Sequence, residues 1–416
     1  MNAFTWAFLA ALTAATAARL WLASRHIRHI ASHRATVPEA FAEQISLASH
    51  QKAADYTSAK TRLGMLEVVL GAALVLAFTL GGGLEALSSA WAGAFEHGGL
   101  WHGVALVVSL VLATSALDLP FAWYRTFVVE ARFGFNRMTP ALFLADLAKQ
   151  SAIAAVLGIP LLALVLWLMQ RMGQYWWLYV WATWVAFNLL VLTFYPTYIA
   201  PLFNKFSPLQ DESLKERIER LLARCGFQSQ GLFVMDSSKR SSHGNAYFSG
   251  FGAAKRIVLF DTLIARLAPQ EIEAVLAHEL GHFSHRHVAK RIVLLFGLSL
   301  AFLALLGWLI AQDWFYSGLG VETPSTAAAL LLFFLAAPSF TFLLNPLTSL
   351  YSRKHEYEAD AYAAQQADGA DLVRALVKLY QDNAATLTPD PLHSAFYDSH
   401  PPAALRIERL KARAAA

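Results

Sequence analysis

Residues 269–312 read PQEIEAVLAHELGHFSHRHVAKRIVLLFGLSLAFLALLGWLIAQ. The first half is polar and contains four histidines, whereas the second half, from Arg291 onward, is almost entirely apolar. A helix needs about 20 mostly apolar residues to cross a bilayer, and the second half meets that length. His282 precedes Arg291 by nine residues, or about 13 Å along a continuous helix. The stretch therefore predicts a membrane protein whose histidine-bearing helix meets the bilayer surface.

Further apolar segments make this a multi-pass protein. The apolar residue types supply 56% of the 416 residues and the charged types only 15%, against about 25% charged in soluble domains. This balance excludes a soluble globular protein, and the aromatic content excludes a disordered one. We predict seven spans, near residues 3–24, 64–92, 100–120, 150–170, 175–203, 291–312 and 326–350.

The positions of lysine and arginine predict the orientation of the spans. Basic residues follow the first and third spans and are frequent in 204–290 and 351–416, while the loops 93–99 and 313–325 have none. Basic loops stay on the cytoplasmic side, so the N-terminus lies outside and the two long polar segments lie in the cytoplasm. The first segment could also be a cleaved signal peptide, but the basic charge follows it, which favours an uncleaved anchor. Because the basic residues are dispersed, no nucleic acid is expected as a partner.

We divide the chain into four parts on this basis. They are five N-terminal transmembrane helices with cytoplasmic loops (1–203), a cytoplasmic segment that contains the histidine-bearing helix (204–290), transmembrane helices six and seven (291–350) and a C-terminal cytoplasmic segment (351–416).

A small α+β unit is predicted within 204–290. Residues 211–225 have the spacing of an amphipathic helix that stops at Gly226. Two short apolar runs at 231–236 and 255–261 read as strands, and the polar, glycine-punctuated segment 241–250 between them reads as a loop or edge strand.

Polar residues within the spans point to cavities or partners, because an ionisable group at membrane depth is costly. Glu67 is expected to face water or a buried partner, and Glu85 to lie at the interface. Pro338, Asn345 and Pro346 predict a kinked last span that lines polar space.

The motif His278-Glu279-Leu280-Gly281-His282 has the spacing of a zinc site. Residues four apart lie on one helix face, so two imidazoles can hold one Zn²⁺ while the glutamate beside the first acts on the metal's water. The chain has one cysteine, Cys225, so a metal site must use histidines and carboxylates. The other interpretation is a polar helix face with solvent-exposed histidines.

A catalytic zinc ion takes a third protein ligand, which does not stand close by. A metzincin would place a glycine three and a histidine six residues past His282, and the sequence has neither. On that spacing, His285 and His287 are expected to be polar surface residues rather than ligands.

The best distant donor is the segment SRKHEYEADAY at 352–362. Glu356 and Asp360 are four residues apart and share a helix face, so Glu356 can bind the metal while Asp360 accepts a ring N–H from a ligating histidine. Glu358 points about 200° round the helix from Glu356 and cannot replace it. Without the zinc motif, the segment would be read as an exposed acidic helix end.

Three further residues are weaker candidates. His400 precedes a proline pair and Arg406 lies in the following helix, so either could stabilise the oxyanion of a tetrahedral intermediate. From these residues alone, helix capping and a surface salt bridge are the more common explanation, because helices often begin at a proline. Asn245 could hydrogen-bond an extended peptide, or act only as a turn former.

The residues resemble those of the type I CAAX prenyl endopeptidases, membrane-integral zinc metalloproteases of the gluzincin kind. The blocks that match are VVEARFGFNRMTP (128–140), YIAPLFNKFSPL (198–209), SSHGNAYFSGF (241–251), HELGH (278–282), SRKHEYEADAYA (352–363) and SHPPAALRI (399–407). The resemblance extends over most of the chain, and the order and spacing of these blocks also match.

The resemblance implies one zinc ion on His278, His282 and Glu356, with Glu279 as general base and acid. It also implies seven helices around a water-filled chamber, and cleavage of peptides with a prenylated C-terminal cysteine.

The resemblance further implies a substrate-aligning role for Asn245 and active-site roles for His400 and Arg406. The hypothesis is a membrane-embedded zinc endopeptidase that acts on a peptide or protein, lipidated or otherwise apolar. A quality-control protease of the heat-shock type, which resembles this family but has fewer spans, is the alternative, and a non-enzymatic protein with a structural metal is another. An alanine- and leucine-rich composition favours a bacterial inner membrane over the endoplasmic reticulum.

Overall fold

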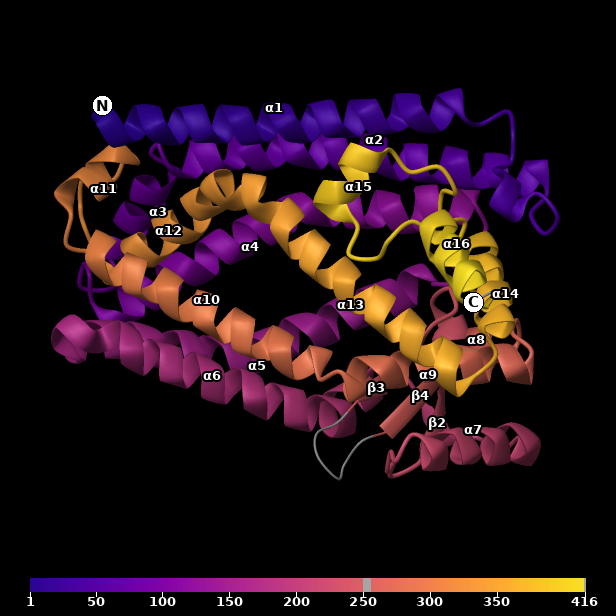
Figure 1. Cartoon of the computed structure of the whole chain (residues 1–416). Coiled ribbons are helices and arrows are strands. Elements are labelled where there is room, and N and C mark those ends of the chain that lie inside the picture. The colour runs from indigo at the N-terminus through magenta and orange to yellow at the C-terminus, as the bar shows by residue number, and fades with distance from the viewer. Residues whose placement is uncertain (250–255, 415–416) are drawn as a thin grey trace.

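A bundle of long helices makes up most of the molecule, and a smaller unit with strands lies at one end of it (Figure 1). The computed structural model describes residues 1–249 and 256–414. Helices α9 (Pro269–Ser284) and α13 (Asn345–Gln366), far apart in the sequence, pack against each other where the bundle meets this unit. The predicted fold class, a helical membrane protein with a small α+β unit, is confirmed.

Seven segments among the described residues are long and apolar enough to cross a membrane. Their helices are α1 (Ala3–Ser32), α2 (Leu47–Phe78), α4 (Leu100–Tyr124), α5 (Pro140–Arg171), α6 (Trp176–Phe194), α10 (His287–Leu309) and the pair α12 (Thr326–Thr341) and α13. Two short helices, α3 (Gly83–Ala92) and α11 (Asp313–Gly318), lie between them. The predicted number of spans is confirmed.

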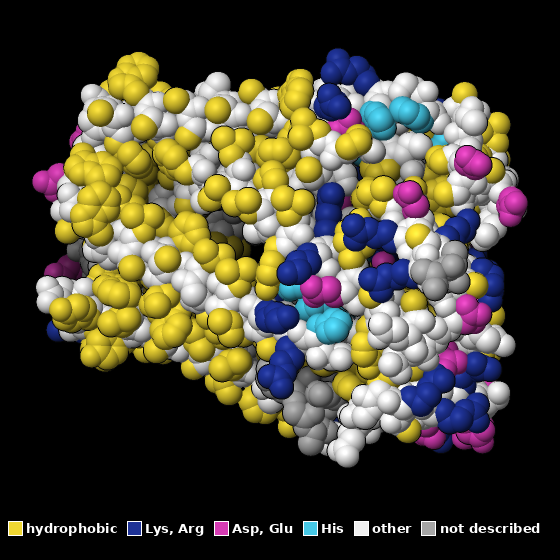
Figure 2. Space-filling view, viewed as in Figure 1, with side chains coloured by type: hydrophobic (Ala, Val, Ile, Leu, Met, Phe, Trp, Pro, Cys, Tyr) yellow, Lys and Arg dark blue, Asp and Glu magenta, His cyan; other side chains and the backbone are white. Residues whose placement is uncertain are grey.

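The surface of the bundle suits a lipid environment. Hydrophobic side chains cover the bundle, whereas charged ones gather over the strand-containing unit (Figure 2). Large apolar side chains of α10 such as Val293, Leu295 and Trp308 are exposed. A recess opens on this face between α10 and α13 (Figure 2).

The second span differs from its predicted bounds of 64–92. Its helix α2 begins earlier, at Leu47, and ends at Phe78, and residues 83–92 form the separate helix α3. Gly82, in the left-handed conformation with φ +75°, stands between the two helices. Glycine adopts this conformation without a Cβ penalty, so the glycine run ends one helix and starts another.

The polar residues predicted within the spans have partners. Glu67 pairs with Arg125 of the π-helical turn Arg125–Glu130. Glu85 accepts hydrogen bonds from the backbone N–H of Glu322 and the hydroxyl of Thr323. The kink predicted in the last span is confirmed, because the 3₁₀ turn Phe342–Leu344 separates α12 from α13.

The small unit contains a four-stranded sheet in the order β1-β2-β4-β3. Its strands are β1 (Phe206–Pro208), β2 (Leu232–Met235), β3 (Ala246–Ser249) and β4 (Arg256–Phe260). Strand β4 pairs in parallel with β2 and antiparallel with β3, with Ala246 opposite Leu259. Both predicted strands and the predicted edge strand are therefore present, although Gly250 and Lys255 lie outside the described residues.

Helices cover this sheet and complete the unit. They are α7 (Glu212–Arg224), α8 (Asp261–Ile264), α9, α14 (Gly369–Asp382) and α16 (Ala403–Ala414), whereas α15 (Pro391–Tyr397) packs against α1 and α13. Asp211 caps α7 by accepting from the N–H of Leu214, and Gly226 follows its end with φ +62°. The apolar face of α7 joins Ile257 and Leu259 of β4 and the buried residues of α9 in one core.

Close packing of α9 on α13 depends on a glycine. A Cβ at Gly281 would lie 2.9 Å from the Cα of Ala359 and 3.1 Å from its carbonyl oxygen. Such contacts are too short for any residue with a side chain, so glycine at this position allows the two helices to approach. The glycine between the two motif histidines therefore sets their distance from α13.

The predicted continuous helix from the motif into the membrane is wrong. Helix α9 ends at Ser284, and α10 begins at His287 after Arg286, whose φ is +56°. A left-handed residue with a Cβ breaks an α-helix and changes its direction. The chain therefore turns just after the second motif histidine.

Candidate metal centre

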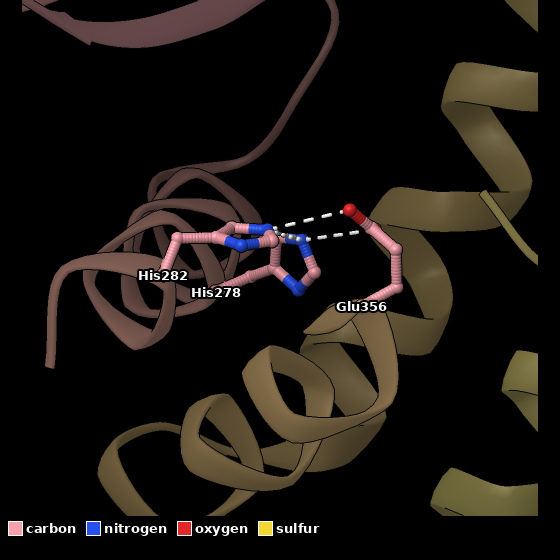
Figure 3. Close-up of side chains that lie close together, drawn as sticks. All are labelled: His278, His282 and Glu356. Carbon is pink, nitrogen blue, oxygen red and sulfur yellow. Dashed lines mark hydrogen bonds and ion pairs between the residues drawn. The ribbon is translucent and has the colours of Figure 1, made fainter. Parts of the chain in front are cut away.

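Three side chains from two helices point toward one another (Figure 3). His278 and His282 extend from α9, and Glu356 extends from α13. The Nε2 atoms of the two histidines are 3.3 Å apart. Glu356 places Oε2 3.5 Å from Nε2 of His278 and Oε1 3.4 Å from Nε2 of His282. We call these three residues the metal cluster.

The donor atoms of the metal cluster have the spacing of ligands on one ion. Nitrogen and oxygen ligands lie about 2.0–2.1 Å from tetrahedral zinc, which separates any two of them by about 3.3–3.4 Å. The two imidazole planes cross at 84°, so one point can lie in both planes. Among the described residues, Oε2 of Glu356 is buried without a hydrogen-bond partner. Because a buried carboxylate oxygen without a partner is costly, the residues fit a cation at this point.

A buried ion pair supports the first histidine. Nδ1 of His278 lies 2.9 Å from Oδ1 of Asp360. Arg406 of α16 holds the same carboxylate in a bidentate pair, with its Nε 2.8 Å from Oδ2 and its Nη2 2.6 Å from Oδ1. Asp360 accepts a hydrogen bond from the Nδ1–H group of His278, which leaves the lone pair on Nε2 of His278 free to bind metal.

The field at the metal cluster favours positive charge. Burial alone would lower the pKa of His278, but hydrogen bonds to Asp360 and Glu356 raise it to about 9. The same carboxylates attract a divalent cation at the point where the donor atoms converge. Burial also raises the pKa of Glu279 above the ordinary value of a carboxyl group, although the two histidines oppose this effect.

The structure brings His400 close to the cluster. Its Nε2 lies 3.4 Å from Oε1 of Glu356, and its side chain is 61% exposed. An exposed imidazole beside the metal ligands can contact a bound substrate.

Asn245 lies elsewhere, at the start of the edge strand β3, and is exposed. Its side-chain oxygen accepts from the N–H of Ala246, and its carbonyl accepts from the N–H of Phe260. These bonds hold the segment at the sheet edge, where an extended peptide can be added as a further strand.

The prediction that His287 is a polar surface residue is wrong. Its relative exposure is 3%, because the turn at Arg286 folds it back against the motif. Nδ1 of His287 lies 3.1 Å from Nδ1 of His282, and its Nε2 lies 2.8 Å from Oε2 of Glu358. The turn at Arg286 makes this contact possible, and no glycine or proline in the sequence marks that turn.

His287, His355 and Glu358 form a second group that could supply three metal-binding atoms. We call these residues the second cluster. The rings of His287 and His355 stack in nearly parallel planes, 3.9 Å apart and inclined by 10°.

A cavity of about 840 Å³ lies where the ends of α4 and α6 meet α5. Its lining is mostly apolar and includes Leu119, Phe143, Leu147, Ile153 and Phe203. Ser241 and His243, in the segment that leads to Asn245, line its polar part. The same segment therefore borders the cavity and leads into β3, which packs on α9.

Two family models cover most of the chain. Residues 26–205 match the CAAX prenyl protease N-terminal family, described as five membrane helices, and residues 208–414 match peptidase family M48.

Curated relatives and a solved structure agree with these matches. The CAAX prenyl protease 1 homolog of Arabidopsis thaliana is 39% identical over 314 residues, covering 75% of this chain and 73% of the relative. CAAX prenyl protease 1 of Saccharomyces cerevisiae is 36% identical, with coverages of 71% and 69%. The human homolog is 33% identical, with coverages of 73% and 73%. The crystal structure of S. mikatae Ste24p superposes with a TM-score of 0.89 and 31% identity over 99% of each chain.

Proposed function

This chain belongs to peptidase family M48, and from that premise we propose that it is a zinc endopeptidase that cleaves peptides near a prenylated C-terminal cysteine. It is a multi-pass membrane metallopeptidase, and the relatives carry the name CAAX prenyl protease 1. The observation that carries the zinc assignment is the 3.3–3.5 Å spacing of the three donor atoms in the metal cluster. One ion per chain follows because the part of the chain that the structure describes contains one set of donors with this converging geometry.

Each residue of the proposed site has one task. His278, His282 and Glu356 would hold zinc, which when bound would polarise the scissile carbonyl and lower the pKa of a water. Glu279 takes a proton from the attacking water and delivers it to the leaving amine, and its raised pKa suits both steps. His400 donates to the oxyanion of the tetrahedral intermediate.

Two further residues position other groups rather than take part in the chemistry. Arg406 is 5% exposed and bonded to Asp360, so we assign it to fixing the carboxylate behind His278 rather than to contact with the substrate. Asn245 aligns the peptide along β3, in the manner of an added strand.

The lipid of the substrate fits the cavity between α4, α5 and α6. An isoprenoid chain is apolar, as is most of the cavity lining, and 840 Å³ lies within the usual range for ligand pockets. The cavity borders the segment 241–245 that precedes the peptide-binding edge, which supports entry of peptide and lipid from one side.

Matched peptides test the proposal. Detergent-purified protein is given one peptide with a prenylated C-terminal cysteine and one without, alongside chelator-treated enzyme. We expect cleavage of the prenylated peptide and loss of that cleavage on chelation. Equal cleavage of both peptides would support the quality-control alternative, which these relatives do not favour, and no cleavage despite bound zinc would support a non-enzymatic protein.

A pair of tryptophan variants tests the cavity. Leu147→Trp fills the lining of the cavity, whereas Leu144→Trp on the same helix changes a side chain that is 54% exposed. We expect Leu147→Trp to raise KM for the prenylated peptide and Leu144→Trp to leave it unchanged. Equal KM values in the two variants would contradict the assignment of the cavity.

Location and orientation follow from the composition and the charge pattern. We propose that the spans cross a bacterial inner membrane, with the strand-containing unit on the cytoplasmic side. The curated relatives described above are eukaryotic and do not test this location. Labelling of single cysteines introduced into the loops 93–99 and 313–325 from outside intact cells would test the orientation.

A further inference from the structure

We propose that His287 and Glu358 position the second zinc ligand, His282, through a relay of hydrogen bonds, and that the second cluster is not itself a metal site. The inference rests on the zinc ligands assigned under the proposed function. The relay consists of the contact of 3.1 Å between Nδ1 atoms of His282 and His287 and the contact of 2.8 Å between His287 and Glu358.

The chemistry of the three groups fixes the direction of the relay. A carboxylate only accepts hydrogen bonds, so Nε2 of His287 carries a proton and donates to Glu358. Nδ1 of a neutral His287 is then an acceptor, and Nδ1 of His282 donates to it. This leaves the lone pair on Nε2 of His282, which is the nitrogen that faces Glu356. The relay therefore selects the tautomer of His282 that can bind a metal.

The two zinc-binding histidines thus receive the same support by different routes. His278 donates directly to the carboxylate of Asp360. His282 donates to a second imidazole, which in turn donates to the carboxylate of Glu358. Ligating histidines generally donate their other ring N–H to such a partner, and its removal weakens metal binding.

The backbone supplies an independent reason to assign a function to His287. Arg286 holds a left-handed φ of +56° at the turn between α9 and α10. A residue with a Cβ is strained there, and such strain persists where the surrounding structure requires it. The consequence of this turn is to bury His287, with 3% exposure, against His282.

The second cluster is not arranged to bind a metal. A metal lies in the plane of each imidazole that it binds, along the nitrogen lone pair. The stacked rings of His287 and His355 are 3.9 Å apart and nearly parallel, so no nearby point lies in both planes. Both nitrogens of His287 already make hydrogen bonds. His355 instead packs on the face of His287 and holds the ring in place.

Two substitutions at position 287 separate positioning from packing. Asparagine places an oxygen three bonds from Cα, where Nδ1 stands in histidine, and can still accept from His282. Glutamine is closer to histidine in size but places its amide four bonds from Cα, toward Glu358. If His287 only fills space, His287→Gln should retain more zinc affinity than His287→Asn. If His287 accepts a hydrogen bond from His282, His287→Asn should retain more.

The test measures zinc affinity of full-length, detergent-purified protein by competition with a chromophoric chelator, together with zinc per chain. We expect His287→Gln to weaken zinc binding about 10- to 100-fold and His287→Asn to weaken it less. His285 lies on the same turn, so His285→Gln is the matched control. We expect this variant to bind zinc as the wild type does. Thermal melting of each metal-free variant reports whether it folds.

Several outcomes overturn the relay. Wild-type affinity in His287→Gln, or a greater loss in His287→Asn than in His287→Gln, would do so. Two zinc ions per chain, with the second lost in His355→Gln, would make the second cluster a metal site. Loss of zinc in His278→Gln but not in His287→Gln refutes the relay alone, whereas retained zinc in His278→Gln refutes the ligand set and the relay with it.

Discussion

The metal cluster and the second cluster contain the same residue types, two histidines and one glutamate each, and lie side by side. Both take a glutamate from α13, but the histidines of the metal cluster lie on α9, whereas His287 begins α10 and His355 lies on α13. In the metal cluster the ring planes cross at 84°, and one carboxylate oxygen has no hydrogen bond from any residue that the structure describes. In the second cluster the rings stack at 10° and both nitrogens of His287 are already bonded. A metal site therefore requires free lone pairs that converge on one point, and the presence of suitable residue types is not sufficient.

The same substitution in the two clusters should have the largest and most unequal effects. Glu356→Gln removes a charged ligand and should abolish both zinc retention through purification and turnover. Glu358→Gln keeps an acceptor for His287, so zinc affinity should fall by about 10-fold at most. Metal analysis of both purified proteins measures this difference. Equal zinc contents would contradict the assignment of zinc to the metal cluster alone.

Glu279→Gln separates metal binding from chemistry within the metal cluster. The amide cannot take the proton of the attacking water, so kcat should fall by about 10²- to 10⁴-fold. Zinc content should stay at the wild-type value, because Glu279 is not assigned as a ligand. Assay of the prenylated peptide alongside metal analysis gives both readings, and retained activity would remove the general-base assignment.

Gly281→Ala should affect both clusters together. A Cβ at this position lies 2.9 Å from the backbone of Ala359, so α9 and α13 must move apart. Overpacking of this kind costs about 1–3 kcal/mol in the free energy of unfolding, and zinc affinity should fall with it. Chemical denaturation and chelator competition measure the two effects, and wild-type values for both would show that the helices are not held by this contact.

His355→Gln should have the smallest effect. His355 stacks on His287 but makes no assigned contact with a zinc ligand. Because the relay bonds stay in place, we expect the change in zinc affinity to fall below the roughly 10-fold lower bound for lost metal-supporting groups. A loss as large as that of His287→Gln would show that the stacking, rather than the relay, controls His282.

The sequence predicted the parts of the site that depend on spacing along one helix. The i, i+4 spacing placed His278 and His282 on one face, and the same rule paired Glu356 with Asp360 on a distant helix. The structure brings these four residues together, with Asp360 behind His278 as expected. The seven spans were equally predictable, because the length of an apolar segment is read directly from the sequence.

Features that depend on local backbone conformation or on three-dimensional packing were not predictable. No glycine or proline marks the turn at Arg286. The sequence therefore predicts a continuous helix with His287 on its surface. The sequence predicts that the second span ends at residue 92, which is 14 residues beyond the end of α2 at Phe78, because apolar residues continue past the three glycines. The pairing of Arg406 with Asp360 was also not predictable, because the two residues lie on separate segments that meet only in the folded chain.

Anomalous diffraction at the zinc edge from crystals of the full-length protein tests the central claim most directly. The account predicts one peak per chain, about 2.0–2.2 Å from Nε2 of His278, Nε2 of His282 and a carboxylate oxygen of Glu356. It predicts no peak between His287 and His355. A peak at the second cluster, or a peak at the motif histidines without Glu356, would contradict it.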